Sequence, residues 1–428
     1  MKSKKEFSSN KTEDQFFRID PKSLFRLPWT KADNAMTWLE PTRKCNISCE
    51  ACFAINDPNS EKPLLRIKKE LETMLLLRRC DAMLIAGGEP LTHPDIVKIT
   101  GMVKAHNLKP VIITNGVNLD PKLVKELKKA GAHGFTFHVD SHQSRPGWEG
   151  KSEKELNELR QHFADMLYHE GKLICSFNTT VFPDALPYIP DLIEWSQQNV
   201  DRVNIFSLIA VRLMETDGSL ECYVQNKKID LSGMAYSSVK SIEKLSTHQI
   251  YRQVKKAMPE FELCAYLGGT VFPDSLKWTI GCWVGSKKKA FGSMGSKSME
   301  ILQNFHHLIK GTYLAYTKPA LNRKGRLMFL LGLFDPSIRK VTKKYLLFTL
   351  RRPQLLFTKL YSQTINIMQP IDILSNGEAD TCDGCPNITL WKDRLVSSCR
   401  LDDYLKFGSP IQFFPKIKKD NLSFQKEI

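Results

Sequence analysis

Apolar and β-branched residues recur in short runs over the first half of the chain, and turn residues bound each run. Runs of this length and composition are typical of buried strands. We therefore predict six strands, at residues 35–42, 82–88, 109–116, 134–140, 173–181 and 200–210.

The segments between these strands have the spacing of helices. In residues 94–107 and 120–132 the apolar positions lie three or four apart, which places them on one helical face. Strands that alternate with helices run parallel and are joined by right-handed crossovers. The sequence therefore predicts an α/β fold, a partial (β/α)6 barrel whose strands end at one common mouth.

The alternation of strand and helix fades near residue 215, and this change suggests where the chain divides. We expect a polar arm, the barrel, a mixed connecting region, a basic amphipathic segment and a compact cysteine-bearing tail. Their predicted ranges are 1–34, 35–215, 216–322, 323–365 and 366–428.

Composition and charge narrow the class of protein. With 428 residues, 42% of them hydrophobic, the chain can bury a large core. Its first residues lack the apolar stretch of a secretory signal, and no window reaches the roughly 18 to 20 apolar residues of a membrane span. We expect a cytoplasmic protein, and its net charge of +16 favours an anionic partner such as nucleic acid, a lipid surface or a phosphorylated substrate.

Eleven cysteines in a reducing compartment favour metal or cluster ligation over disulfides. Cys45, Cys49 and Cys52 have the spacing of one loop that binds three irons of a cubane cluster and leaves the fourth iron open. A structural zinc site is the alternative, although it normally needs four closed ligands and no second pair lies nearby.

Polar residues stand at the ends of the next three predicted strands, and Asn178 lies inside the fifth. Glycines allow close backbone approach there, and the carboxylate of Glu89 suits an ammonium group. A plain turn after the third strand, and a structural polar network in the fourth and fifth, are the alternatives. These candidate binding residues are Gly87, Gly88, Glu89, Pro90, Thr114, Asn115 and Asn178, with His138 and Asp140 as candidate catalytic residues.

The tail carries a second set of three cysteines, Cys382, Cys385 and Cys399, spaced like another cluster cradle. A zinc knuckle is the alternative. Cys264 or Cys282 is a candidate for a fourth ligand, whereas Cys80, Cys175 and Cys222 are expected to be ordinary thiols.

The cysteine loop and the Gly-Gly-Glu-Pro stretch together resemble the radical S-adenosylmethionine (SAM) superfamily. The resemblance implies that Cys45, Cys49 and Cys52 hold a [4Fe-4S] cluster whose open iron is chelated by SAM, and that Glu89 meets the SAM amino group. An electron from a donor such as flavodoxin or ferredoxin would then cleave SAM to a 5′-deoxyadenosyl radical. One departure is Ala51, because an aromatic residue commonly precedes the third cysteine, and here Phe53 follows it.

The tail looks like the auxiliary [4Fe-4S] domain of the molybdopterin-precursor enzyme and its relatives. The stretch from Gly134 to Trp148, continuing through residues 155–160 to the tail, is also similar to the group that contains archaeal tetraether-lipid synthases. These resemblances imply a C-terminal auxiliary iron-sulfur domain, a second [4Fe-4S] cluster, and hydrogen abstraction from a lipid or isoprenoid-like substrate, with alkyl coupling or methylation as the reaction.

A basic and apolar segment agrees with a lipid substrate. Residues 323–359 carry ten Lys or Arg against one acid, Asp335, interleaved with leucine and phenylalanine. Such a segment can lie peripherally in an anionic membrane surface; a core helix pair with a solvated basic face is the alternative. Neutralising Lys343, Lys344, Arg351 and Arg352 is then expected to release the protein from anionic liposomes.

Two other functions are compatible with parts of the sequence. A radical SAM peptide-modifying maturase would use the same two clusters. A zinc-containing nucleic-acid-binding protein would explain the charge but not the glycine-rich loop, so no nucleic-acid partner is expected.

Overall fold

The computed structural model describes residues 19–212, 219–231, 234, 243–350 and 352–416. Six adjacent parallel strands follow one another in chain order along the main sheet. They are β2 (Met36–Thr42), β3 (Ala82–Gly87), β4 (Lys109–Thr114), β5 (Gly134–His138), β6 (Ile174–Val181) and β7 (Ile205–Ala210). The six predicted strands are thereby confirmed, with small differences at their ends.

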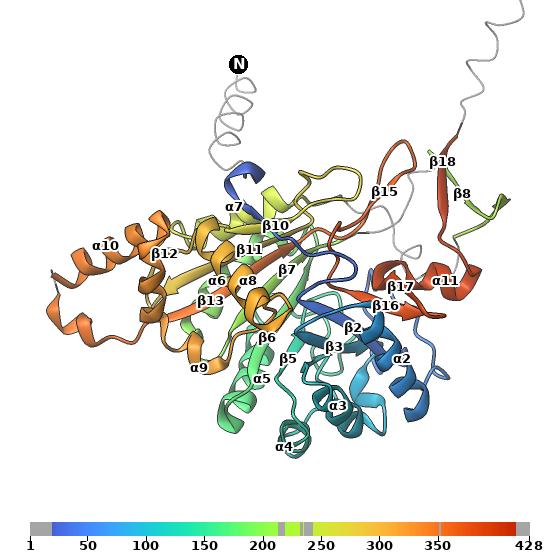
Figure 1. Cartoon of the computed structure of the whole chain (residues 1–428), viewed down its shortest axis with the longest axis horizontal. Helices are drawn as coiled ribbons and strands as arrows, with labels where there is room; N and C mark the ends of the chain where they lie inside the picture. Colours follow the sequence, from blue (N-terminus) through green and yellow to red (C-terminus); the bar gives the residue numbers. More distant parts are fainter. Residues whose placement is uncertain (1–18, 213–218, 232–233, 235–242, 351, 417–428) are drawn as a thin grey trace, which may run out of the picture.

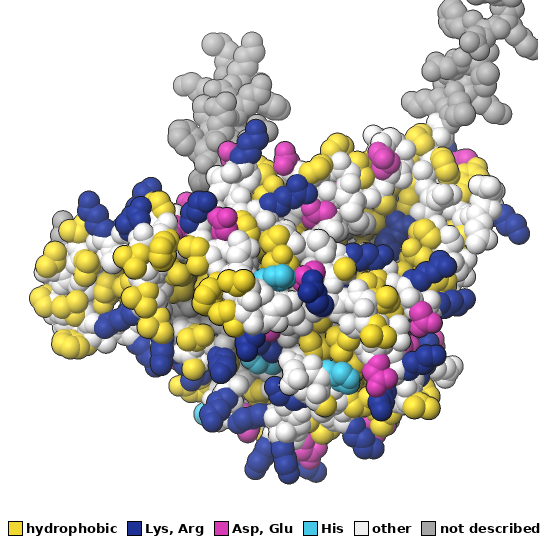
Figure 2. Space-filling model, viewed as in Figure 1, with side chains coloured by type: hydrophobic (Ala, Val, Ile, Leu, Met, Phe, Trp, Pro, Cys, Tyr) yellow, Lys and Arg dark blue, Asp and Glu magenta, His cyan; other side chains and the backbone are white. Residues whose placement is uncertain are grey.

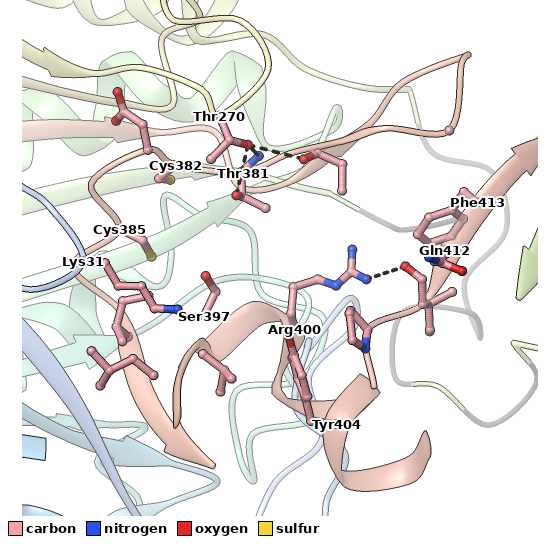
Figure 3. A pocket seen from close by; sticks show the side chains of 18 residues that line it. Lys31, Thr270, Thr381, Cys382, Cys385, Ser397, Arg400, Tyr404, Gln412 and Phe413 are labelled. Atoms are coloured by element: carbon pink, nitrogen blue, oxygen red, sulfur yellow. Dashed lines mark hydrogen bonds between the residues drawn. The ribbon is translucent and has the colours of Figure 1, made fainter. Parts of the chain in front are cut away.

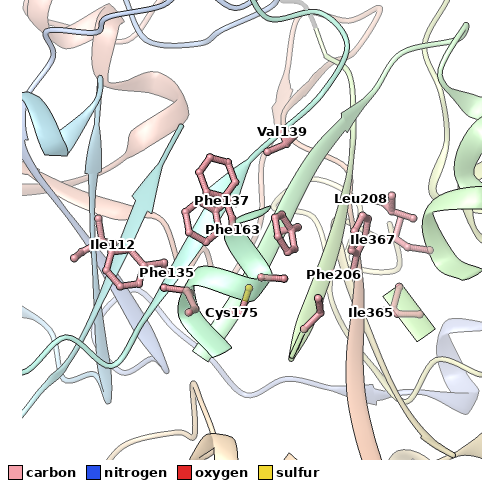
Figure 4. Close-up of a cluster of buried hydrophobic side chains, with 14 of the residues drawn as sticks. Ile112, Phe135, Phe137, Val139, Phe163, Cys175, Phe206, Leu208, Ile365 and Ile367 are labelled. Atoms are coloured by element: carbon pink, nitrogen blue, oxygen red, sulfur yellow. The ribbon is translucent and has the colours of Figure 1, made fainter. Parts of the chain in front are cut away.

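Helices between the strands pack on the outer face of the sheet (Figure 1). They are α2 (Leu64–Leu77), α3 (Ile96–Ala105), α4 (Pro121–Lys129), α5 (Asn157–Glu170) and α6 (Ile189–Gln198). Between these helices and the sheet lies the main core, in which Phe163 of α5 stacks on Phe137 of β5 with ring centroids 4.3 Å apart (Figure 4). Because side chains alternate along a strand, Thr136 and His138 of β5 face the opposite, inner side of the sheet.

The sheet continues beyond β7, which corrects the predicted division near residue 215. β13 (Tyr361–Met368) pairs parallel with β7, and β11 (Trp278–Gly285) pairs antiparallel with β13. β10 (Ala265–Leu267), β12 (Ala290–Ser293) and β1 (Phe25–Arg26) complete the eleven strands. Residues of the predicted connecting region and basic segment are therefore part of the barrel sheet.

The predicted N-terminal arm is also wrong in its second half. β1 pairs with β10, and the side chains of Leu27 and Trp29 are buried in the core on the inner side of the sheet. Residues 1–18 of this arm lie outside the described part of the chain.

The remaining helices lie along the later strands. α7 (Thr247–Ala257) packs against α6, α8 (Ser296–Lys310) contacts β1, and α9 (Pro319–Asn322) contacts β13. η5 (Gly325–Leu333) and η6 (Pro353–Phe357) pack against α10 (Pro336–Leu350), which forms one end of the molecule (Figure 1). Short helical turns are η1 (Pro21–Ser23), η2 (Pro90–Thr92) and η3 (Leu186–Tyr188). No described helix is long and apolar enough to cross a membrane.

The C-terminal part is built from short elements, one of which, β16 (Ile388–Trp391), packs against β2. They are β14 (Asp372–Ile373), β15 (Ala379–Asp380), β16 (Ile388–Trp391), β17 (Arg394–Ser397), η7 (Ser398–Arg400), α11 (Leu401–Phe407) and β18 (Gln412–Pro415). β18 pairs with β8 (Leu220–Val224), which pairs with β9 (Lys227–Lys228). Thr37 of β2 donates a hydrogen bond to the Ile388 carbonyl at 2.9 Å, so this part is joined directly to the barrel.

Candidate functional site

The loop that carries Cys45, Cys49 and Cys52 leaves the C-terminal end of β2, as the sequence predicts. Cys45 and Cys49 are half-buried and Cys52 is exposed. Burial raises the pKa of both the Cys45 and the Cys49 thiol, so these thiols are protonated at neutral pH until a metal displaces the proton. Three thiols on one loop are the donor set that a [4Fe-4S] cluster with one open iron requires.

Gly87 and Gly88 let this loop pack against the end of β3. A Cβ on Gly88 would lie 2.4 Å from the Lys44 carbonyl oxygen, and Gly87 has a φ of +120°. The Gly88 and Glu89 amides donate to the Thr42 and Lys44 carbonyls at 3.0 and 2.8 Å. In this structure the glycines bring the backbone close to the cysteine loop, in addition to any approach to a ligand.

Glu89 is buried and accepts three hydrogen bonds from its own and the next strand end. Its donors are the Thr114 hydroxyl at 2.7 Å, the Asn115 amide at 2.6 Å and the Leu91 amide at 2.9 Å. Burial raises the pKa of Glu89 even though these hydrogen bonds oppose the change. Glu89 therefore fixes the turn after β4, and the sequence did not show this role. Pro90 begins η2 and is buried.

Asn115 links that turn to the cysteine loop. Its side-chain amide donates to the Asn46 side chain at 2.7 Å and lies 3.9 Å from the Cys45 sulfur. Residues predicted at the ends of separate strands, such as Cys45 and Asn115, therefore lie close together at one mouth of the barrel, as expected for parallel strands.

The loop after β5 holds the other side of the cysteine loop. Cys49 pairs with Gln143 as an antiparallel bridge, and the Ser144 amide donates to the Ser48 carbonyl at 2.8 Å. Arg145 is buried and donates to the carbonyls of Asn115 and His138 at 2.5 and 3.1 Å. Arg145 is not among the predicted site residues, because the sequence of a loop does not show whether an arginine in it will be buried.

His138 and Asp140, the predicted catalytic pair, hydrogen-bond to each other at 3.0 Å. His138 Nε2 also lies 3.0 Å from the Thr180 hydroxyl. Burial alone would raise the pKa of Asp140, but the hydrogen bonds and charge of His138 lower it. The pair forms the polar network that the sequence left as an alternative, and His138 keeps a third of its side chain exposed. Asn178 pairs with His138 across β5 and β6 and is partly exposed on the same inner face.

A second histidine that contacts carboxylates lies beside the cysteine loop. His142 contacts Glu50 at 2.5 Å and Asp184 at 3.1 Å, and its ring stacks on Phe182 with centroids 3.6 Å apart. Burial would lower the pKa of His142, but the two carboxylates raise it. Among the described residues no three His, Cys, Asp or Glu side chains are grouped for a single metal ion.

Two of the three tail cysteines, Cys382 and Cys385, line a cavity of about 510 Å³. Cys382 and Cys385 line one side of it, and Gln412 and Phe413 lie opposite (Figure 3). The Cys382 thiol donates a hydrogen bond to Cys385, which lowers the pKa of Cys385, whereas burial raises the pKa of Cys399 to about 12. Three neighbouring thiols suit the predicted second cluster.

The predicted fourth ligands lie elsewhere. The backbone of Gly269 pairs with that of Cys382, next to the tail site. Cys264 precedes β10 and lies about 16 Å from Gly269 when the distance is counted along an extended chain. Cys264 is buried on the inner side of the sheet, and Cys282 of β11 packs on the same core. This placement corrects the expectation that Cys264 or Cys282 completes the tail site. Cys80, Cys175 and Cys222 are buried, as expected of ordinary thiols.

Residues 39–184 match the Radical SAM superfamily. This range contains the first cysteine loop and every contact that clamps it from β3, β4 and β5. Residues 39–184 are a radical SAM domain. The domain implies a [4Fe-4S] cluster and SAM as cofactors, and the match goes against the alternative of a zinc-containing binding protein.

Two curated relatives are similar to part of this chain. The chain is 28% identical over 135 residues to an AdoMet-dependent heme synthase of Methanosarcina barkeri, covering 30% of this chain and 38% of that protein. It is 37% identical over 104 residues to an S-adenosylmethionine-dependent nucleotide dehydratase of Selenomonas ruminantium, covering 24% and 38%. The chain therefore spans less than half of the length of these relatives. Both relatives are named as enzymes, one a synthase and the other a dehydratase.

Among solved structures, Streptococcus suis SuiB bound to S-adenosylmethionine is similar at 17% identity, with a TM-score of 0.38. The similarity covers 52% of this chain and 47% of that chain.

Proposed function

We propose that Cys45, Cys49 and Cys52 bind the cluster of the radical SAM domain, and that the enzyme abstracts hydrogen from a lipid or isoprenoid-like substrate. The observation that carries the first part is the clamp around the cysteine loop, which Gly88, Asn115 and Gln143 hold from three successive strand ends. A cluster held there would supply the electron that cleaves the sulfur–carbon bond of SAM, giving methionine and a 5′-deoxyadenosyl radical that would abstract hydrogen.

The protein's own groups position this loop and set its charge. Glu89 fixes the turn that carries Asn115, and Arg145 places a buried cation beside Cys49 and Asp140. A cation at this position favours an anionic cluster and the carboxylate of a bound amino acid. His138, at the edge of the same mouth, is placed to contact SAM or substrate through its exposed part.

The inner face of the sheet supports a substrate with a polar end and an apolar body. Strand register puts four polar residues side by side in one row, from β5 to β13: His138, Asn178, Ser207 and Asn366. Among the described residues the buried Asn366 Oδ1 has no hydrogen-bond partner, so a hydroxyl donor from a ligand or water would stabilise it. Along the same inner face, Ile113, Ile205, Ile280 and Cys282 are partly exposed apolar residues.

We place a second [4Fe-4S] cluster at Cys382, Cys385 and Cys399 under the same proposal. A buried cation, Arg78, supports an anionic group there, because it acts electrostatically on Cys385 and donates to the Cys385 carbonyl at 2.8 Å. Lys277 acts on Cys382, but its ammonium is also paired with Asp372 and Asp380 at 2.6 and 3.1 Å. Peripheral association with an anionic membrane, which the sequence predicts, would bring the enzyme to a lipid substrate.

The test begins with anaerobic reconstitution of the full chain with iron and sulfide, followed by dithionite and SAM. We expect about eight irons per chain and formation of 5′-deoxyadenosine, both reduced in Cys45→Ala. Zinc in place of iron, with SAM left intact, would contradict the proposal.

The substrate is tested separately with vesicles of chain-deuterated lipid. Deuterium in the 5′-deoxyadenosine would support hydrogen abstraction from the lipid chain. Formation of 5′-deoxyadenosine without deuterium would contradict the lipid substrate and leave the SAM chemistry standing, and a peptide-modifying activity would then be the next to test.

A further inference from the structure

α10 has two apolar faces, only one of which the protein covers. Ile338, Val341 and Tyr345 pack into a core against β11 and β12. On the opposite side, Leu346, Leu347 and Leu350 are 50%, 52% and 76% exposed. Residues three and four apart share one helical face, so these three leucines form a continuous stripe.

η5 adds a parallel ridge. Leu327, Leu330 and Leu333 follow each other at intervals of three, and in a 3-10 helix residues three apart lie directly above one another. All three are exposed, whereas Met328 and Leu331 of the same helix pack against the core on the inner side of the sheet.

A groove of about 510 Å³ runs between the ridge and the stripe. Leucine and phenylalanine line it, and Arg339 and Lys343 supply its charges. We call the six exposed leucines, together with Arg339, Lys340, Lys343 and Lys344, the leucine tip. Figure 2 shows hydrophobic side chains gathered over the end of the molecule where α10 lies, with Lys and Arg around them.

The charge of the tip has one sign. Arg339, Lys340, Lys343 and Lys344 are exposed on α10. Asp335, the one acid between residues 323 and 359, is buried and points inward, where it accepts from the Gly295 amide at 2.8 Å and from Ser298.

We infer that the leucine tip docks on an anionic lipid bilayer. Long apolar side chains flanked by cations match the acyl boundary and the phosphate headgroups of such a surface. A protein partner fits less well, since protein interfaces are depleted of lysine and this tip carries three. This docking rests on the membrane association of the proposed function, to which it assigns a surface, and its test does not depend on the SAM chemistry.

The test is co-sedimentation of the full chain with vesicles, without any iron or SAM. We expect binding to vesicles of phosphatidylglycerol and phosphatidylcholine at low salt, weaker binding at high salt, and much weaker binding to phosphatidylcholine alone. Lys343→Ala and Lys344→Ala are expected to weaken binding by about fivefold each. The double variant Leu346→Ser/Leu347→Ser is expected to weaken it by at least about tenfold. Arg351 lies outside the described residues and is left unchanged.

Matched controls come from other exposed residues. Lys122→Ala/Lys125→Ala on α4 removes two cations away from the tip, and Leu65→Ser/Leu76→Ser on α2 removes two exposed leucines. We expect both controls to bind like the unchanged protein. Equal weakening by controls and tip variants, or no sedimentation with anionic vesicles, would overturn the inference. Self-association that Leu346→Ser/Leu347→Ser abolishes, without vesicle binding, would assign the tip to a second copy of the chain instead.

Discussion

Arg43 and Asp402 form a buried ion pair across 359 positions of the chain. Asp402 also accepts from the Ile55 amide at 2.8 Å, and Arg43 also pairs with Glu40 at 3.1 Å. Arg43 lies just before the first cysteine loop and Ile55 lies just after it. Both ends of the loop therefore contact Asp402 of α11, the helix that follows Cys399. The two candidate cluster sites are joined through one carboxylate.

Removing that carboxylate is expected to loosen the first site. In Asp402→Asn the buried Arg43 keeps only Glu40 as an anionic partner among the groups described above, so we expect a loss of about 3 kcal/mol in the free energy of unfolding. A chelator should also remove iron faster from the reconstituted variant. The exposed Asp393→Asn serves as control. Equal iron loss in both variants would show that this ion pair does not hold the loop.

Gly88 is expected to tolerate no side chain. In Gly88→Ala the new Cβ would meet the Lys44 and Arg43 backbone at 2.4 to 2.5 Å and displace the cysteine loop. We expect iron content to fall by up to about four per chain. In Gly101→Ala, within α3, the nearest atom is 3.9 Å away, so iron is retained and stability rises by about 0.5 kcal/mol. Full iron in Gly88→Ala would mean that the loop can shift without losing its geometry.

The cysteines differ in their distance from the two proposed cluster sites. We expect Cys399→Ala to lose up to about four irons, and Cys264→Ala and Cys282→Ala to lose none. Iron per chain and the absorbance of the reconstituted proteins provide the measurement. A loss of iron in folded Cys264→Ala would return that residue to the tail site.

Asp335 is expected to stabilise the α8–α10 region in a pH-dependent way. Burial would raise the pKa of Asp335, but hydrogen bonds from Ser298, Ser337 and Gly295 lower it overall. A carboxyl whose pKa is lowered by folding contributes stability above its unfolded pKa, and this contribution is lost as the pH falls through the folded pKa. Asp335→Asn should therefore cost about 1 to 2 kcal/mol at neutral pH.

The measurement is thermal unfolding of both proteins from pH 3 to pH 8. The difference between them should shrink toward pH 3, while the exposed Asp274→Asn stays close to the unchanged protein throughout. A difference that is constant over the whole range would mean that the charge of Asp335 plays no part.

The sequence by itself determined the six parallel strands, the mouth at their C-terminal ends and the spacing of the cysteines. These features are local, because the apolar pattern of a strand and the spacing of ligands in a loop each extend over only about ten residues. Only the tertiary structure decided which distant segments join them. β13 pairs with β7 so that Asn366 meets Ser207, 159 positions earlier, and Asp402 reaches Arg43.

Such partners cannot be identified from either segment alone, since many pairings are compatible with one apolar run or one charge. The same reason explains the misplaced fourth ligand. Cys264 and Cys282 can ligate metals like any cysteine, but the register of β10 and β11 places both on the inner side of the sheet, away from the tail. The side chains that come into contact are decided by the close packing of the whole sheet, because this packing removes apolar surface from water.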